Sequence, residues 1–127
     1  MSGVVYDAGA LIAAERNDRR MWAIHAAFLS AEVVPSVPTV VLAQAWRGGP
    51  RQTALARMLR GCDVEVLDEV GARSAGVLLS WSGRSDVIDA VVAERASHRK
   101  HAVVTSDPAD IRALGDAANE RLRIHVI

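Results

Sequence analysis

Two short apolar runs near opposite ends of the sequence each end in an aspartate. Residues 4–6 precede Asp7, and residues 102–104 lead through Thr105 to Asp107. Apolar runs this short, bounded by turn-forming residues, are typical of buried strands in a parallel sheet. Ligands of open α/β sheets bind outside the carboxyl ends of the strands. We therefore expect the two aspartates to converge at one edge of a sheet, although they lie far apart in the sequence.

A second pair of aspartates, Asp86 and Asp89, opens a helix-like segment between the two runs. Like charges are costly to bring together, and a bound cation is a common reason for doing so. Asp89 stands within the otherwise apolar residues 87–92, where an unpaired charge needs such a reason. The pattern predicts a shared metal site. For Asp7, Asp86 and Asp107, helix capping is the competing interpretation.

The composition favours one cytoplasmic domain, residues 1–127, without a membrane segment. Half of the residues are hydrophobic and the mean hydropathy is +0.14, yet no apolar stretch approaches the roughly 20 residues of a membrane span. Asp7 interrupts the first apolar run before a signal-peptide core could form. The single cysteine, Cys62, excludes an internal disulfide and a cysteine-based zinc site. A net charge of zero gives no global argument for binding nucleic acid.

Segments of strand length and helix length alternate along the chain. The expected strands cover residues 3–7, 33–34, 64–67, 102–105 and 123–127. The expected helices cover residues 8–16, 18–30, 69–81, 86–98 and 108–118, with Asp18 capping the second of these and Ser85 the fourth. Two more helices are expected between residues 38 and 64. Pro38 opens one, which Gly48 and Gly49 end, and Pro50 opens the other. This alternation predicts a layered α/β fold with a parallel sheet and right-handed crossovers.

Four motifs, taken in their order along the chain, resemble the PIN domain, and within it the small VapC-type ribonuclease toxins. They are VYDAGALIA at 5–13, LAQAWRGG at 42–49 after Val37 and Pro38, DVIDA at 86–90, and VVTSDPAD at 103–110. The likeness spans essentially the whole chain. It implies a PIN-like three-layer α/β fold, with a short, mostly parallel central sheet flanked by helices.

The resemblance also implies an activity and its partners. It implies a metal-dependent endoribonuclease, the toxin of a type II toxin–antitoxin system, with Mg²⁺ or Mn²⁺ held by Asp7, Asp89 and Asp107. It further implies a homodimer and a cognate antitoxin whose C-terminal segment wraps the toxin and places a basic side chain in the acidic pocket. The chemistry agrees, because Mg²⁺ prefers oxygen ligands and can activate water for attack on a phosphodiester.

Four further residues are candidates at the same site. Asp86 lies on the same helix face as Asp89, Asp110 follows Asp107 by three positions, and the Thr105 hydroxyl could orient a carboxylate or a water. Gln44 stands where the family commonly carries a glutamate. Because an amide offers an oxygen without a charge, metal affinity should fall.

Gln44 leaves a second function open, that of a catalytically weak PIN-like module that binds RNA or protein. A phosphatase with an aspartate nucleophile is disfavoured, because it needs a second aspartate two residues after the first, where Gly9 stands. Arg47, Arg51 and Arg84 flank the proposed pocket in sequence and could contact phosphates.

Two of the tryptophans, Trp46 and Trp81, stand among apolar residues at helical spacing. This pattern favours a place in the core or at a subunit interface over base stacking.

Overall fold

The structure, a computed structural model, describes residues 3–127 and contains one five-stranded sheet. The strands are β1 (Val4–Tyr6), β2 (Ser36–Pro38), β3 (Asp63–Glu65), β4 (Ala102–Thr105) and β5 (Ile124–Val126). Their spatial order is β3-β2-β1-β4-β5, and every pairing is parallel. The prediction of a short, mostly parallel central sheet is confirmed.

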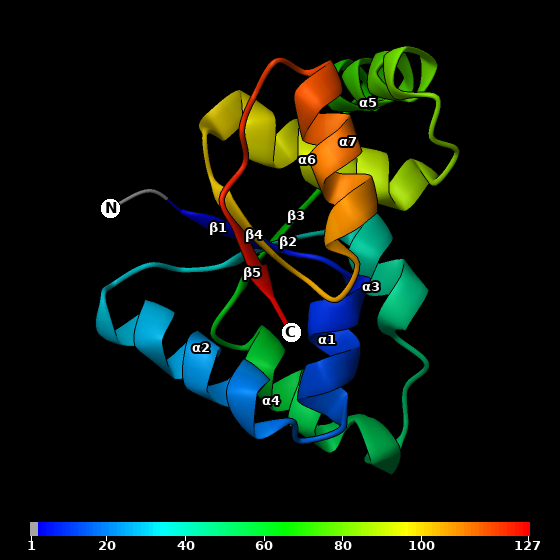
Figure 1. Cartoon of the computed structure of the whole chain (residues 1–127). Coiled ribbons are helices and arrows are strands. Elements are labelled where there is room, and N and C mark those ends of the chain that lie inside the picture. The colour runs from blue at the N-terminus through cyan, green and yellow to red at the C-terminus, as the bar shows by residue number, and fades with distance from the viewer. Residues whose placement is uncertain (1–2) are drawn as a thin grey trace.

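The helices lie in two groups on either side of this sheet. They are α1 (Ala8–Glu15), α2 (Arg19–Ser30), α3 (Thr39–Ala45), α4 (Thr53–Leu59), α5 (Glu69–Ser82), α6 (Val87–Arg99) and α7 (Pro108–Ala117), with a single 3₁₀ turn, η1 (Pro50–Gln52). Figure 1 shows α5, α6 and α7 above the sheet and α1, α2 and α4 below it. Helix α3 contacts both groups, because it packs against α1 and α6. The three layers predicted from the sequence are therefore present.

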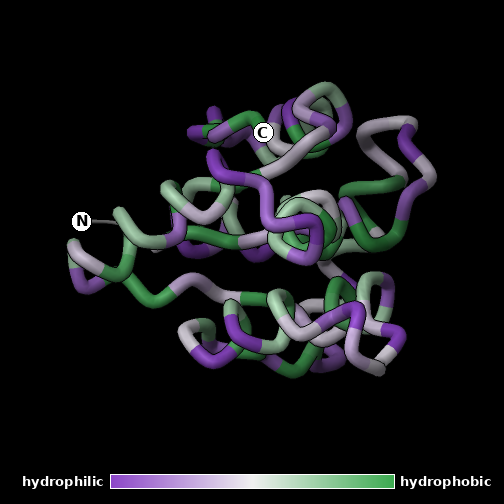
Figure 2. Tube along the Cα trace, turned by 90° about the horizontal axis from the view of Figure 1, so that it is seen from below, coloured by the Kyte–Doolittle hydropathy of each residue, from purple (hydrophilic) through white to green (hydrophobic). Residues whose placement is uncertain are grey.

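The central strand β1 and its neighbour β4 are apolar almost throughout, and the structure buries them completely. All residues of β1 and β4 are buried, and Val5 pairs with Val103 across them. Helices cover both faces of a parallel sheet, so strands at its centre have no solvated side. Figure 2 shows hydrophilic and hydrophobic residues interspersed along most of the helices, a pattern that allows a helix to bury one side.

The second strand begins later than the sequence predicted. Residues 33–34 are not a strand, because Val33 closes the end of α2 by donating its backbone N–H to the Phe28 carbonyl at 2.9 Å. Pairing with β1 starts at Ser36. As a result Pro38 ends β2 and precedes α3, whereas the sequence predicted it as the first helical residue.

Several element boundaries also differ. Asp86, not Ser85, caps α6, because its carboxylate accepts a hydrogen bond from the Asp89 amide at 3.0 Å. The segment opened by Pro50 begins as the 3₁₀ turn before α4 starts. Strand β3 lies at the sheet edge and covers 63–65 where 64–67 was predicted, and β5 is shorter than predicted at both ends. The predicted cap of α2, Asp18, is confirmed by its hydrogen bond from the Met21 amide.

Candidate metal centre

Asp7 lies where β1 ends and α1 begins, and its side chain is almost fully buried, with 5% exposed. Its Oδ1 accepts a hydrogen bond from the Ala10 amide at 2.9 Å, so the residue does cap α1. Burial raises the pKa of Asp7, while the Thr105 hydroxyl and the Ala10 and Gly9 amides act in the opposite direction. The charge of Asp107 raises it further. Asp7 therefore both caps α1 and lies close enough to Asp107 to feel its charge.

Gly9 allows the chain after β4 to approach α1 closely. A Cβ atom at this position would collide with the Ser106 hydroxyl and would lie 3.2 Å from Asp7 Oδ1. Every other residue type carries that atom, so any substitution would force the Ser106 side chain to shift. The small residue after Asp7 therefore helps to bring the segment with Ser106 and Asp107 against the first helix.

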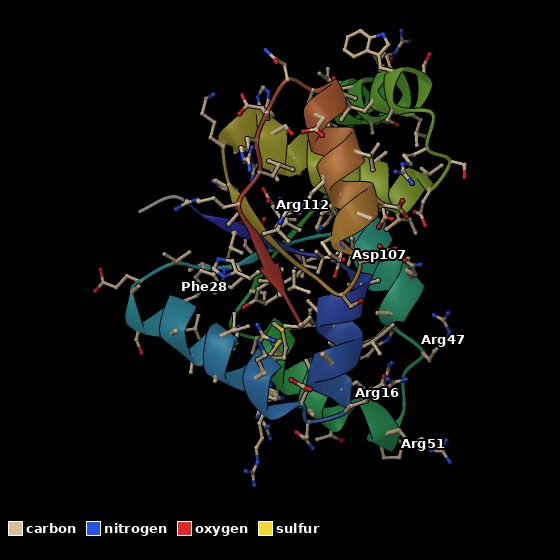
Figure 3. The ribbon with its side chains drawn as sticks, viewed as in Figure 1. Arg16, Phe28, Arg47, Arg51, Asp107 and Arg112 are labelled. Carbon is tan, nitrogen blue, oxygen red and sulfur yellow. The ribbon has the colours of Figure 1, made fainter. Side chains whose placement is uncertain are left out.

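Three carboxylates form a tight cluster beside Asp7. One oxygen from each of Asp89, Asp107 and Asp110 lies within 4.8 Å of the other two. Asp89 comes from the first turn of α6, while Asp107 and Asp110 come from the start of α7. Thr105, which is fully buried, accepts a hydrogen bond from the Asp107 amide at 2.9 Å. Figure 3 shows Asp107 at the end of the loop from β4, next to α1 and α3.

The electrostatics of Asp89 reflect this crowding. Its pKa rises to about 7, first because the carboxyl is partly buried and then because of the charges of Asp86, Asp7, Asp110 and Asp107. A carboxyl among uncompensated negative charges holds its proton more tightly, and a bound cation reverses the effect. Asp89 and these four aspartates therefore concentrate negative charge in one part of the molecule.

The predicted site residues fall into three classes by position. Asp89 and Asp107 lie in the tight cluster, and Asp7 lies beside it without belonging to the set of oxygens within 4.8 Å. Asp110, considered only as an additional candidate, completes the cluster. Asp110 follows Asp107 by three residues, which places both on one side of the first turn of a helix. This spacing could have identified Asp110 as a main candidate from the sequence.

Asp86 and Gln44 are both exposed. Asp86 is exposed and its carboxylate caps α6. Gln44 is exposed on the last turn of α3, the helix that packs against both α1 and α6.

Arg84 has a role that the sequence did not reveal. Its Nη1 donates to Asp110 Oδ1 at 2.9 Å, so one carboxylate of the cluster already has a cationic partner. Both side chains are partly exposed, which leaves the guanidinium free to exchange between this carboxylate and a ligand.

Gln52 organises the basic loop after α3, and nothing in the sequence marked it. The side chain is 4% exposed, and its Oε1 accepts from the amides of Arg47 and Gly48 at 2.7 and 2.8 Å. Its Nε2 donates to Glu15 at the end of α1 and to the Ala45 carbonyl. Gln52 thus ties the loop that carries Arg47 to the last turn of α1.

A surface cavity of about 470 Å³ opens beside the acidic cluster. It is lined by Gly9, Ile12, Ala13, Arg16, Asp18, Ser106 and Ile127. Gly9 and Ser106 also border Asp7, so the cavity adjoins the acidic site. Figure 3 shows Arg16, Arg47 and Arg51 on the side of the molecule below Asp107.

Two other reactive side chains, Cys62 and His25, are not prepared for nucleophilic chemistry. Burial raises the pKa of the Cys62 thiol to about 12, so it stays protonated at neutral pH. His25 is buried, and its Nδ1 forms a 2.9 Å hydrogen bond with the Tyr6 hydroxyl.

No model of a protein family and no curated protein matches the chain. Solved structures do match it in fold. VapBC2 from Rickettsia felis, bound to a DNA fragment from their promoter, superposes with a TM-score of 0.74 at 13% identity, over 98% of each chain. The chain has a PIN-like fold. Two further structures agree: a toxin-antitoxin complex from Klebsiella pneumoniae, with a TM-score of 0.68 at 13% identity over 85% of this chain and 89% of the other, and PAE2754 from Pyrobaculum aerophilum, with a TM-score of 0.68 at 16% identity over 97% and 83%.

The PIN-like resemblance drawn from the motifs is thus confirmed at the level of the fold. Among residues 3–127, no helix has both the length and the apolar character needed to cross a membrane.

Proposed function

We propose that this PIN-like protein is a metal-dependent endoribonuclease and the toxin component of a type II toxin–antitoxin system, acting on RNA in the cytoplasm. The observation that carries the proposal is the cluster of Asp89, Asp107 and Asp110 beside buried Asp7, at the carboxyl ends of the two central strands. Carboxylates in that place support hydrolysis assisted by a metal ion.

The donor set fits a hard divalent cation. Mg²⁺ binds oxygen at about 2.0–2.1 Å, so two ligand oxygens on one ion are at most about 4.2 Å apart. The three oxygens of the cluster lie within 4.8 Å of one another, so a small side-chain adjustment would bring them onto a common ion. The pKa of Asp89 is raised first by burial and then by the charges of four neighbouring aspartates, and a bound cation would compensate those charges. Mg²⁺ or Mn²⁺ would be held by Asp89 and Asp107, with Asp110 or Asp7 completing the set.

Such an ion, when bound, supplies Lewis-acid polarisation of a phosphoryl group and acidifies a water ligand. The chain's own residues supply the positioning. The Thr105 hydroxyl holds the Asp107 amide and faces the Asp7 carboxylate, so it fixes two acidic residues relative to each other. Arg84 offsets the charge of Asp110 and is exposed enough to turn toward a phosphate.

The substrate path that we propose runs from the acidic cluster across the cavity of about 470 Å³ to Arg16. The Gln52 network holds the loop with Arg47 against the end of α1, close to Arg16, the residue that caps the C-terminus of that helix. Phosphate contacts of this kind position a nucleic acid without selecting its sequence. RNA is proposed as the substrate from the PIN-like resemblance of the motifs.

Two protein partners form part of the proposal, a cognate antitoxin and a second copy of the chain. Helix α5 presents the apolar side chains of Val70, Val77 and Trp81, which are 75, 43 and 69% exposed. Spacings of seven and four residues place them along one side of the helix, and exposed apolar stripes of this kind support contact with another protein. We assign this stripe to the homodimer and the acidic pocket to a basic side chain of the antitoxin.

A catalytically weak module that binds RNA or protein is the second candidate. The observation that favours it is Gln44, an exposed amide on the helix that packs against α6, in the motif position where a glutamate is expected. A site with one charge fewer binds Mg²⁺ less tightly. This candidate predicts RNA binding with poor turnover, above all at low Mg²⁺ concentration.

Three charge-removing variants test the proposal. Asp7→Asn, Asp89→Asn and Asp107→Asn should each lower Mg²⁺-dependent cleavage of RNA, on the order of 100-fold or more, because each removes a charge at the site without changing its shape. Asp116→Asn, on the exposed side of α7, is the matched control and should cleave normally. Wild-type cleavage by two of the three variants would overturn the assignment.

A further inference from the structure

Trp46 is the first residue after α3, and its side chain lies at the surface. The residue ends the helix by donating its backbone N–H to the Leu42 carbonyl at 2.8 Å, and its own backbone is extended. The side chain is 40% exposed, which excludes a place in the core, one of the two positions that the sequence favoured. Among residues 3–127, no aromatic ring or cationic group stacks on this indole. Trp46 therefore offers an aromatic face to a ligand.

The other two tryptophans are placed differently. Trp22 is partly buried, and the guanidinium of Arg57 lies over its ring, 4.6 Å from the centroid. Trp81 belongs to the apolar stripe on α5. Trp46 is instead the only exposed large hydrophobic side chain between residues 35 and 63. A ring that stands alone suits one planar group better than the broad surface of another protein.

The guanidinium of Arg47 is held against the backbone of Trp46. Its Nη1 donates to the Trp46 carbonyl at 2.7 Å and to the Ala43 carbonyl at 3.2 Å, both at the end of α3. Arginine has several further N–H donors, which these two bonds leave for a phosphate. The Arg47 amide also donates to the buried Gln52 Oε1 at 2.7 Å, which fixes the loop at this point. An aromatic ring and a guanidinium on neighbouring residues match the base and the phosphate of a nucleotide.

This pair lies along the substrate path proposed above. Gln52 Nε2 donates to Glu15, the residue before Arg16, so the loop after α3 is tied to the end of the helix that lines the cavity of about 470 Å³. Helix α3 begins at the carboxyl end of β2, next to β1, whose carboxyl end leads into Asp7. At about 1.5 Å per residue, α3 extends roughly 10 Å from that edge of the sheet. A strand of a few nucleotides therefore spans from the acidic cluster to Trp46.

The charge around Trp46 favours a nucleic acid. Arg16, Arg47 and Arg51 are exposed, and among residues 3–127 none of them forms an ion pair. Figure 3 shows all three on the same side of the molecule, below Asp107. Proteins that bind single-stranded nucleic acids combine such positive charge with aromatic side chains on which bases stack.

We propose that Trp46 is a substrate-contacting residue, on which a base of single-stranded RNA stacks while Arg47 binds a neighbouring phosphate. The inference rests on the proposed endoribonuclease function and adds the form of the substrate, a strand with an unpaired base close to the cleavage site. Bases inside a duplex are already stacked on both faces, so a double-stranded RNA leaves no face for Trp46.

Binding of RNA to variants of the full chain tests this contact. A short fluorescein-labelled single-stranded RNA of mixed sequence is titrated in EDTA, which prevents metal-dependent cleavage, and anisotropy reports binding. Trp46→Leu should weaken binding by about tenfold or more, because it removes the aromatic face. Trp46→Phe, the matched control, keeps an aromatic ring and should bind within about threefold of the unaltered chain. A duplex of the same sequence should bind Trp46→Leu and the unaltered chain equally, through its phosphates.

Fluorescence gives a second readout that a purely structural role of Trp46 would not change. Single-stranded RNA should quench part of the tryptophan emission of the unaltered chain. This quenching should be absent in Trp46→Phe, although the RNA is bound. Melting temperatures report whether both variants remain folded.

The proposal is overturned if single-stranded RNA does not bind, if Trp46→Leu binds it like the unaltered chain, or if this variant weakens duplex binding equally. Loss of dimers in Trp46→Leu with unchanged RNA binding would also overturn it, because the residue would then contact a second copy of the chain. Cleavage in Mg²⁺ is measured separately. RNA that is bound through Trp46 but never cleaved refutes only the nuclease function, and cleavage with unchanged RNA binding by Trp46→Leu refutes only the stacking.

Discussion

Arg84 Nη1 lies 2.9 Å from Asp110 Oδ1, so that a guanidinium neutralises one of the three carboxylates gathered at the ends of α6 and α7. The chain therefore carries its own partial counter-ion for the acidic cluster. The same contact places a phosphate-binding group at the edge of the proposed metal centre. A divalent cation and this guanidinium would thus compete for Asp110.

This relationship predicts that Arg84→Gln tightens Mg²⁺ binding, since the ion no longer competes with a guanidinium. We expect the dissociation constant for Mg²⁺ to fall only about two- to fivefold, because the Arg84–Asp110 pair is partly exposed and solvent screens it. Calorimetric titration with Mg²⁺ measures it. Arg73→Gln, which breaks an exposed pair on α5 far from the cluster, should leave the constant unchanged. Weaker Mg²⁺ binding by the Arg84 variant would contradict the assignment.

The raised pKa of Asp89 predicts how stability without metal depends on pH. Below the ordinary value of 3.8, the carboxyl is protonated in both the folded and the unfolded chain. Between 3.8 and about 7, the unfolded chain releases a proton that the folded chain retains, so the free energy of unfolding falls as pH rises. Melting temperatures in EDTA at pH 5 and pH 8 should show this fall, and Asp89→Asn should show a smaller one. Equal pH dependence in both proteins would refute the shift.

Gly9→Ala should disrupt the approach of the β4–α7 loop to α1. The new methyl group would meet the Ser106 hydroxyl, and we expect a loss of about 1–3 kcal/mol in the free energy of unfolding, as in other overpacked sites. Gly76→Ala is the control, because it lies in α5 with open space around the added atom and should stabilise that helix by roughly 0.5–1 kcal/mol. Denaturant unfolding measures the free energy of unfolding of both variants. An unchanged free energy of unfolding for Gly9→Ala would contradict the close packing of this glycine against Ser106.

A substitution at Gln44 tests whether the absence of the expected glutamate weakens metal binding. If its side chain reaches the site, Gln44→Glu should tighten Mg²⁺ binding by about tenfold, or roughly 1.4 kcal/mol, and raise cleavage at low Mg²⁺. Without metal it should lower stability, because another carboxylate adds repulsion. Melting temperature against Mg²⁺ concentration separates the two effects. If the melting temperatures of the variant and the unaltered chain differ by the same amount at every Mg²⁺ concentration, Gln44 lies outside the pocket.

The sequence predicted the parts of this fold that depend on apolar pattern. The runs before Asp7 and Thr105 are the most continuous apolar strands, and they form the paired centre of the sheet. It misplaced β2 because Val33 has a strand-forming side chain but is needed to close α2. A two-residue apolar run cannot distinguish these roles.

The convergence of the acidic residues was predictable in outline, because carboxyl ends of parallel strands converge. Asp7, Asp89 and Asp107 followed from that rule together with the resemblance of the motifs. The pairing of Arg84 with Asp110 and the hydrogen bonds of Gln52 depend on contacts between distant segments, which no local spacing records.

The central claim is that RNA is cleaved with the help of a metal ion held by these carboxylates, and metal removal tests it most directly. Purified protein is incubated with single-stranded RNA after thorough treatment with EDTA, and then after Mg²⁺ or Mn²⁺ is added back. We predict no cleavage without metal and restored cleavage with it, with Asp89→Asn inactive in both conditions. Cleavage that survives chelation, or that Asp89→Asn performs as well as the unaltered chain, would contradict the account.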